Sequence, residues 1–140
     1  MERNFEYESL WRFTKNVFVQ IGSGEENAVL AATGLLRADL RGVDSHGIAR
    51  LSGYVRLWEA KRANSNPHLQ IVHETPSTGV VDGDSGLGLV VAPFAMDLAI
   101  SKAKNVGSGW IAVRNSNHFG IAAQHAMKAL EEASYLFNQN

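Results

Sequence analysis

The sequence predicts a mixed α/β (α+β) protein whose helices are grouped at the front. Three observations support this class. Apolar residues recur at helical spacings of three and four through the first 60 residues, and short extended segments begin only after residue 67. Beyond that point helices and strands do not alternate as regularly as in a doubly wound sheet. With 140 residues, 45% of them hydrophobic, the chain has the size and composition of one globular domain.

Two amphipathic helices are expected at the front, over residues 8–21 and 23–41. The apolar stripe of the first consists of Leu10, Phe13, Val17 and Ile21. Gly22 ends this helix, and Ser23 with Glu26 forms a capping box for the second. The buried stripe of the second helix consists of Ala28, Ala31, Ala32, Leu35 and Leu36, and Gly42 ends it.

The remaining elements follow from turn residues and apolar periodicity. A third helix is expected from Ser45, which can cap it, to about Ala60, followed by a polar loop over residues 61–67. Short strands are expected over residues 69–73 and 78–82, with a turn over 83–88. A helix over 89–105 requires Pro93 to lie in its first turn. A strand over 110–113, a polar loop over 114–120 and a last helix from Ile121 complete the chain.

Composition excludes several classes of function. The formal net charge is −1 and no long basic run occurs, so we expect no nucleic-acid partner. No apolar run approaches the ~18 residues of a membrane span. The chain has no cysteine, no secretory signal pattern at its start and no H-x-x-x-H or H-E-x-x-H spacing. We therefore expect a cytoplasmic protein with no metal site.

The third predicted helix carries the first candidate site. At 100° per residue His46, Arg50 and Tyr54 share one face, beside an apolar stripe. An arginine can hold a carboxylate through two parallel hydrogen bonds, and a histidine can transfer a proton near neutral pH. If Ser45 caps the helix, its positive end also favours an anion. An ordinary amphipathic helix with a polar rim would show the same spacing.

A second polar cluster, residues 113–120, follows an apolar strand and contains Asn117, His118 and Gly120. Loops at strand ends often carry functional side chains, although a simple turn that caps the next helix would look similar. A third cluster, residues 81–88, has its glycines in the order G-x-x-G-x-G. This is the reverse of the dinucleotide fingerprint, so it predicts no Rossmann site.

These segments together resemble the malate/L-lactate dehydrogenase family, which also includes ureidoglycolate, sulfolactate and diketogulonate-type enzymes. The resemblance rests on Asp39 to Leu51, on Tyr54, on Asp82-Gly83-Asp84 and on Asn115 to Gly120, and extends from about residue 5 to residue 130. It implies a fold of the family's own that is not a Rossmann fold. It also implies NAD or NADP as cofactor, a small 2-oxo or 2-hydroxy acid as substrate, and a homodimer.

The resemblance also implies roles for individual residues. Ser45, Arg50 and Tyr54 fall on substrate-binding positions, and His118 falls on the position of the proton acceptor. His46 would polarise or orient the same substrate oxygen, although the two histidines could exchange roles. Asn117 and Gly120 are weaker candidates for cofactor binding.

The length departs from the family, whose members are more than twice as long. The expected division is a helical segment over residues 1–66, the start of an α/β cofactor and dimerisation region over 67–132, and a divergent tail over 133–140. The chain would then be a fragment of the enzyme. The alternatives are an inactive remnant and a non-catalytic module that binds a small anion or a partner.

Overall fold

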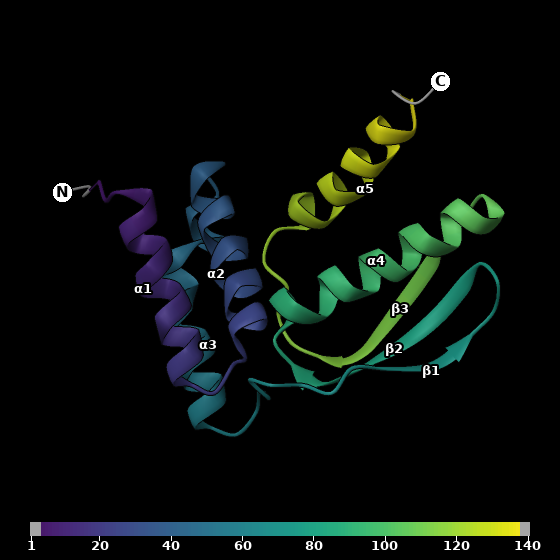
Figure 1. Ribbon diagram of the computed structural model, residues 1–140. Coiled ribbons are helices and arrows are strands. Elements are labelled where there is room, and N and C mark those ends of the chain that lie inside the picture. The colour runs from purple at the N-terminus through teal and green to yellow at the C-terminus, as the bar shows by residue number, and fades with distance from the viewer. Residues whose placement is uncertain (1–3, 138–140) are drawn as a thin grey trace.

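The computed structural model describes residues 4–137 and confirms the mixed α/β class. Three helices come first, α1 (Tyr7–Gln20), α2 (Glu25–Leu40) and α3 (Leu51–Glu59), with short 3-10 turns η1 (Asp44–His46) and η2 (Ile48–Arg50) before α3. The strands are β1 (Gln70–Glu74), β2 (Thr78–Gly86) and β3 (Trp110–Ser116). Helices α4 (Gly88–Val106) and α5 (Ala122–Phe137) follow β2 and β3. The three front helices form one group, and the sheet with α4 and α5 forms another beside it (Figure 1).

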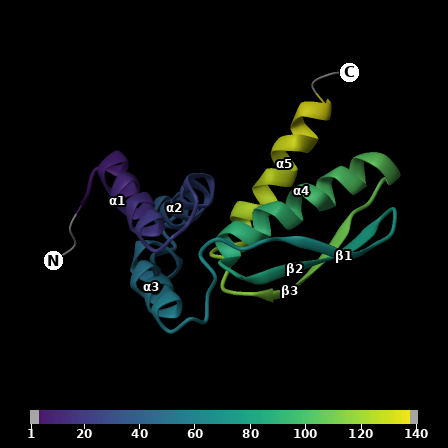
Figure 2. The same ribbon diagram turned by 60° about the horizontal axis from the view of Figure 1, so that its bottom comes forward.

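The sheet has the order β1-β2-β3. Strands β1 and β2 form an antiparallel hairpin in which Gln70 lies opposite Asp82 and Glu74 opposite Gly79. Strands β2 and β3 run parallel, with Thr78 opposite Trp110 and α4 as the connection between them. Helix α4 covers one face of this sheet, and α5 lies beyond it (Figure 2).

A single hydrophobic core joins the two groups. Its front part comes from α1 and α2, where Phe18 and Leu35 are fully buried. Leu51 and Tyr54 of α3 complete it from below, and Leu89 and Val90 enter it from the first turn of α4. The start of α4 is therefore the place where the sheet is attached to the helical group. Within the described residues, no helix is both long enough and apolar enough to cross a bilayer.

The predicted front helices are present, with two corrections. The stripe of α2 is buried as expected, but Phe13 of α1 is 58% exposed, and Thr14 and Phe18 face the core instead. The apolar face of α1 is thus rotated relative to the predicted stripe. The capping box is wrong, because α2 begins after Gly24 without a side-chain cap, and Ser23 Oγ is buried without a partner in the described part of the chain.

The predicted turn over residues 83–88 is also wrong. Strand β2 continues to Gly86, and β3 continues to Ser116. A register irregularity between Asp82 and Gly86 absorbs the turn-forming residues, and Asp84 and Ser85 adopt positive φ there. Residues 83–85 form a bulge between the paired positions Asp82 and Gly86, so pairing with β3 resumes after a segment whose composition is typical of a turn.

Helix α4 differs from the expectation in the place of its proline. Pro93 is the sixth residue of the helix, in the second turn and not the first. The helix tolerates the lost backbone donor there because Pro93 is buried against neighbouring elements, so packing outweighs the local cost. Gly107 ends the helix in the left-handed conformation.

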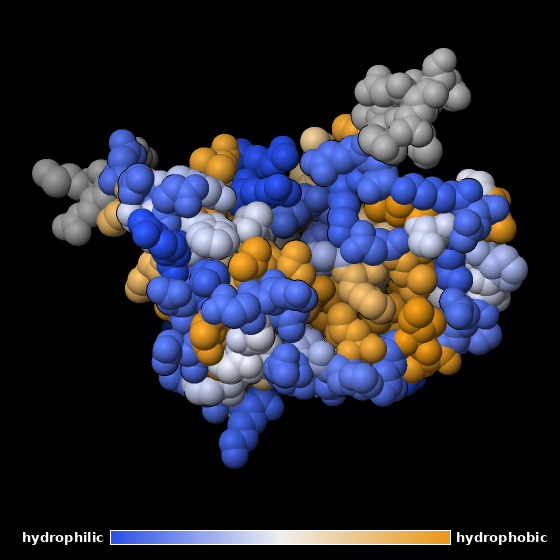
Figure 3. Space-filling view, viewed as in Figure 1, coloured by the Kyte–Doolittle hydropathy of each residue, from blue (hydrophilic) through white to orange (hydrophobic). Residues whose placement is uncertain are grey.

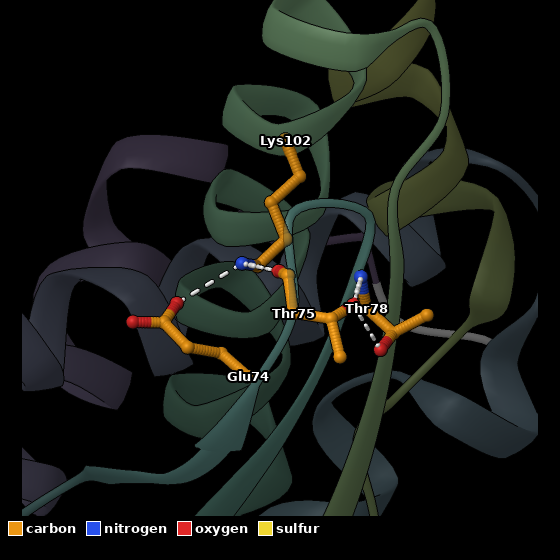
Figure 4. Close-up of polar contacts among 4 residues, drawn as sticks. All are labelled: Glu74, Thr75, Thr78 and Lys102. Atoms are coloured by element: carbon orange, nitrogen blue, oxygen red, sulfur yellow. Dashed lines mark hydrogen bonds and ion pairs between the residues drawn. The ribbon is translucent and has the colours of Figure 1, made fainter.

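A buried lysine attaches the β1–β2 hairpin to α4. Lys102 is 8% exposed, and its ammonium group donates to the Glu74 carboxylate at 3.0 Å and to the Thr75 carbonyl at 2.7 Å. In the turn itself, the backbone N–H of Thr78 donates to Thr75 Oγ1 at 3.0 Å. Figure 4 shows the lysine side chain reaching from α4 to this turn. The contact fixes the far end of the sheet against its covering helix.

Candidate active site

The third predicted helix is broken, which changes how its polar residues are placed. Residues 44–50 form two separate 3-10 turns, and only Leu51–Glu59 are α-helical. The break is at Gly47, whose backbone (φ −88°, ψ −146°) is not helical. Ser45 therefore does not cap a helix, and the expected anion site at a helix end is absent from this segment. His46, Arg50 and Tyr54 do not form one row on a continuous helix.

Asp39 at the end of α2 explains the break. Its carboxylate accepts the backbone N–H of Ile48 at 2.8 Å. A Cβ atom at position 47 would overlap this carboxylate, so only glycine allows the chain to pass. Burial raises the pKa of Asp39 above its ordinary value, against the lowering by the Ile48 hydrogen bond, and the nearby Asp44 carboxylate raises it further. Asp39 and Gly47 together set the path of the chain between His46 and Arg50.

The second polar cluster meets the first at His118. The Tyr54 hydroxyl lies 2.8 Å from His118 Nδ1, and the two residues are 64 positions apart in the chain. The ring of His46 lies with its centroid 5.3 Å from that of His118. The structure thus brings both predicted catalytic histidines and Tyr54 into one site, by tertiary contacts and not by the predicted helical spacing.

The hydrogen bonds of His118 define which of its nitrogens carries the proton. The backbone N–H of Gly120 points to Nδ1 at 3.2 Å. Because a backbone N–H can only donate, Nδ1 is an acceptor, and the neutral ring carries its hydrogen on Nε2. The Tyr54 hydroxyl must then also donate to Nδ1. Two donors on Nδ1 leave Nε2–H as the group available to a substrate.

The surroundings of His118 favour this neutral form. Burial lowers the pKa of His118 below its ordinary value, and the positive charges of His46 and Arg50 lower it further. Tyr54 is 3% exposed, and burial raises its pKa to about 12, against a smaller lowering by Arg50. At neutral pH the pair is therefore a neutral imidazole and a protonated phenol.

Ser45 and Arg50 lie at the edge of the site and are exposed. The Ser45 hydroxyl is 2.9 Å from His46 Nδ1, so it orients the imidazole of that residue. The Arg50 side chain donates from Nε to the Ser45 carbonyl at 2.7 Å. This bond leaves the two terminal nitrogens of the guanidinium free to bind an anion end-on.

Two cavities flank the loop from Ser116 to Phe119. The first, which we call the arginine groove, has a volume of about 410 Å³, and its polar lining consists of Arg50, Tyr54, Arg56, Arg62 and His118. The second, the apolar pocket, has a volume of about 600 Å³ and lies between α4, β3 and the start of α5. Ser116, Asn117 and Phe119 line the apolar pocket. Figure 3 shows apolar side chains gathered over α4 and β3.

Asn117 and Gly120 hold the loop in place. The Asn117 side-chain amide donates to the carbonyls of Ser85 and Gly86 at 2.8 and 3.2 Å, which fastens the end of β3 to the end of β2. Gly120 adopts φ +79°, and a Cβ there would lie 2.9 Å from Leu89. Both residues thereby position His118. Their predicted role in cofactor binding stays a prediction.

The sequence analysis missed three residues of this site. Asp39 was part of the resemblance but had no role, and Arg56 and Arg62 were not singled out. Arg56 could have been found, because it lies on the same helix as Tyr54. His125 of α5 is buried beside the same loop: it is 8% exposed, and its Nε2 lies 2.9 Å from the Phe119 carbonyl. No group of three or more metal-ligating side chains is present in the part of the chain described.

Comparison with known proteins identifies the family. The model of the malate/L-lactate dehydrogenase family matches residues 5–135. The chain belongs to the malate/L-lactate dehydrogenase family. A malate dehydrogenase of Pyrococcus abyssi is 46% identical over 125 residues, and an L-sulfolactate dehydrogenase of Methanocaldococcus jannaschii is 46% identical over 117 residues. These alignments cover 89% and 84% of this chain.

A solved structure of this dehydrogenase family agrees with the fold. Malate dehydrogenase from Pyrococcus horikoshii superposes with a TM-score of 0.90 over 93% of this chain, at 43% identity. The match covers 37% of that chain, and the two sequence relatives are matched over 34% of their length. This member of the malate/L-lactate dehydrogenase family therefore spans about a third of the relatives it matches.

The family implies a nicotinamide cofactor in general, and the residues present fit one part of it. The apolar pocket is lined by Ala92, Ala95 and Met96 of α4 and by Trp110 and Val113 of β3, which suits a flat ring. Within the described residues its lining contains no lysine or arginine to pair with a diphosphate. The fit is therefore to the ring end of the cofactor.

Proposed function

We propose that this chain carries the substrate half of an NAD- or NADP-dependent 2-hydroxyacid dehydrogenase. One observation carries the proposal: the His118 loop separates a cationic groove from an apolar pocket. A small 2-oxo acid needs a positive site for its carboxylate and a donor at its carbonyl oxygen. A nicotinamide needs an apolar site next to the reacting carbon. The two cavities supply these environments on either side of one loop.

The residues of the groove have distinct roles in this proposal. Arg50 holds the substrate carboxylate through the free edge of its guanidinium, because its Nε is already bound to Ser45. The Nε2–H group of neutral His118 donates to the C2 oxygen, which makes C2 more electrophilic. His46, oriented by Ser45, lies beside the same ring and supplies a second imidazole at that oxygen. When bound, the cofactor supplies the hydride to C2 in the reduction direction or accepts it in oxidation.

We propose for Tyr54 a role other than the predicted contact with the substrate. Its hydroxyl is buried and donates to His118 Nδ1, so we propose that it acts on the substrate through His118. In oxidation of a 2-hydroxy acid, His118 must accept a proton at the nitrogen that faces the hydroxyl. The two donors on Nδ1 oppose the shift of the hydrogen to Nδ1 that this requires. Reduction of a 2-oxo acid meets the same constraint, because the imidazolium that gives its Nε2 proton to the C2 oxygen also carries a hydrogen on Nδ1.

The proposal also includes a homodimer, as the family resemblance implies, and a cytoplasmic location, as the composition predicts. The test measures oxidation of NADH and NADPH with a panel of 2-oxo acids, for this chain and for a form continued to the length of the relatives. We expect His118→Ala to slow turnover at saturating substrate, and Arg50→Lys to raise KM by loss of the bidentate contact. An unchanged KM in Arg50→Lys would remove Arg50 from the carboxylate role. Anion binding without activity in either form would favour a non-catalytic module.

A further inference from the structure

His125 is a buried titratable residue that the proposed function does not use. It lies in the first turn of α5, is 8% exposed, and its Nε2 is 2.9 Å from the Phe119 carbonyl. A carbonyl oxygen can only accept, so Nε2 carries a hydrogen whether the ring is neutral or charged. The ring also lines the apolar pocket, and its centroid lies 5.4 Å from that of Phe119. Both contacts attach α5 to the loop that carries His118.

The carbonyl that His125 binds belongs to the peptide group that joins Phe119 to Gly120. This group is planar and trans, so its carbonyl and its N–H point in opposite directions. The N–H is that of Gly120, which donates to His118 Nδ1 at 3.2 Å. One peptide group therefore connects two imidazoles: His125 donates to its oxygen, and its nitrogen donates to His118. A carbonyl that accepts a hydrogen bond also makes the N–H of the same group a stronger donor.

The rest of the loop is held by other contacts, so this peptide group is the part that can turn. The Asn117 backbone N–H donates to the Gly86 carbonyl at 3.1 Å, and the backbone of His118 packs so closely on Gly88 that a Cβ there would overlap it. Figure 1 shows the loop from β3 passing the start of α4 on its way to α5. Gly120, at φ +79°, can adopt φ of either sign, so it permits the peptide group to turn over.

A turned peptide group would change the tautomer of His118. Its carbonyl would then face Nδ1 and would require a hydrogen there, and Nε2 of the neutral ring would become an acceptor. His125 opposes this turn, because its buried Nε2–H would lose its acceptor. Tyr54 acts on Nδ1 directly from α3, whereas His125 acts through the peptide group from α5.

We propose that His125 is a positioning residue that keeps the hydrogen of neutral His118 on Nε2 by fixing the orientation of the Phe119–Gly120 peptide group. Its importance for a substrate rests on the proposed function, in which this Nε2–H donates to the C2 oxygen. His125 lines the apolar pocket, whereas His118 lines the arginine groove. His125 thus controls, from one side of the loop, a hydrogen-bond donor on the other side.

The test uses two substitutions of similar length in the 140-residue chain. His125→Gln keeps an N–H donor at the place of Nε2, because both side chains carry this nitrogen the same number of bonds beyond Cβ. His125→Met has the same length and no donor. Lys128→Met removes the ion pair of Lys128 with Asp97 between α5 and α4, and is the control for a loosened helix. NMR measures the nitrogen shifts and pH titration of the His118 ring, exchange of the Gly120 amide and affinity for pyruvate.

We expect His125→Met to move hydrogen from Nε2 toward Nδ1 of His118 and to speed exchange of the Gly120 amide. The pKa of His118 should rise toward its ordinary value, because a donor that stabilises the neutral ring is lost. Pyruvate binding should weaken about two- to tenfold, which corresponds to the loss of one hydrogen bond. His125→Gln and Lys128→Met should resemble the unmodified chain in every readout.

An unchanged His118 ring in His125→Met would overturn this inference alone. Changes in His125→Gln or Lys128→Met as large as those in His125→Met would overturn it too, because packing and not the hydrogen bond would then be responsible. The expected changes in the ring, without pyruvate binding by the unmodified chain, would overturn the proposed function and leave the positioning role in place.

Discussion

The imidazole of His118 is held by two hydrogen-bond donors on the same nitrogen, and this has a measurable effect. Tyr54 and the backbone of Gly120 both donate to Nδ1, so protonation there would place hydrogen against hydrogen. When His118 is protonated it must therefore give up the Gly120 bond, and the Tyr54 hydroxyl must turn to accept from Nδ1, with the His118 carbonyl 3.4 Å away as the acceptor for its own hydrogen. These hydrogen bonds favour the neutral form of His118. Burial and the charges of His46 and Arg50 favour it too, because they lower the pKa of the ring.

We expect Tyr54→Phe to raise the pKa of His118 toward its ordinary value, because one donor that stabilises the neutral ring is lost. NMR titration of the His118 ring measures this directly, and the nitrogen shifts identify the tautomer. The substitution also removes a partly buried hydrogen bond, at a cost of about 1 kcal/mol in the free energy of unfolding. An unchanged or lower pKa would show that Tyr54 does not bind Nδ1 as a donor.

The same lowered pKa makes stability depend on pH. The unfolded chain binds a proton on this histidine near pH 6.5, whereas the folded chain binds it only at lower pH. The contribution of His118 to stability is therefore complete above pH 6.5 and is lost as pH falls through the folded-state pKa. Urea denaturation between pH 7.5 and 5 should show this loss, and it should be smaller in His118→Gln. An equal slope in both proteins would contradict the assignment.

Gly47 is a residue of this site at which a methyl group should be costly. A Cβ there overlaps the Asp39 carboxylate, so we expect Gly47→Ala to destabilise the chain by about 2 kcal/mol or more and to displace residues 44–50. Gly53→Ala is the matched control, because a Cβ at position 53 meets nothing within 4 Å and lies inside α3. That variant should gain up to about 1 kcal/mol from helix propensity. Thermal unfolding should show a lower melting temperature for Gly47→Ala and a higher one for Gly53→Ala.

At the scale of elements, the break before α3 was the main feature that periodicity could not predict. The positions of His46, Arg50 and Tyr54 fit one helix face, and nothing nearby in sequence contradicts it except one glycine. The deciding contact comes from Asp39, nine residues before Ile48 in another helix. The end of β2 presents the same difficulty, because Gly86 pairs with β3 beyond an irregular segment in which Asp84 and Ser85 have positive φ. Tertiary contacts override local preference in both places.

The attachment of the β1–β2 hairpin to α4 supplies a prediction at this scale. Lys102→Met keeps the apolar stem but leaves the Thr75 carbonyl and the Glu74 carboxylate without their donor. We expect a loss of about 1–3 kcal/mol and faster amide exchange in β1. Glu74→Gln should cost less than about 1 kcal/mol, because this side chain is 55% exposed. Equal losses in the two variants would show that the ion pair, and not the carbonyl contact, holds the hairpin.

At the scale of the whole molecule, the fold class and the two polar clusters that hold the candidate residues were predictable, and the geometry that joins these clusters was not. The polar clusters of Asp39–Leu51 and Asn115–Gly120 were recognisable in the sequence because their residue types suit a carboxylate and a proton. Their meeting at His118 depends on the core that packs α3 against the start of α4. The place of Arg62 in the groove could not be predicted from the sequence, because it depends on the left-handed turn at Lys61.

The sheet leaves an exposed apolar surface. Strand β3 pairs only with β2 in the described part of the chain, and Trp110 and Val113 are 75% and 41% exposed. Exposed sheet edges and apolar patches favour association between molecules. We expect the chain to self-associate in a concentration-dependent way in analytical ultracentrifugation, and Trp110→Arg to reduce this. Phe5→Arg, at an equally exposed position far along the chain, is the control and should have little effect.

The position of Trp110 also allows its fluorescence to report binding in the apolar pocket. Of the three tryptophans, Trp11 is bonded through its indole N–H to Thr33 and Trp58 lies on α3, whereas Trp110 is water-exposed at the wall of the apolar pocket. Emission from an exposed indole is red-shifted and moves to the blue when water is displaced. A planar ring that enters this pocket should therefore shift or quench the fluorescence of Trp110 while leaving that of the other two unchanged. Binding of a ring in the apolar pocket can thus be followed by tryptophan fluorescence, without turnover.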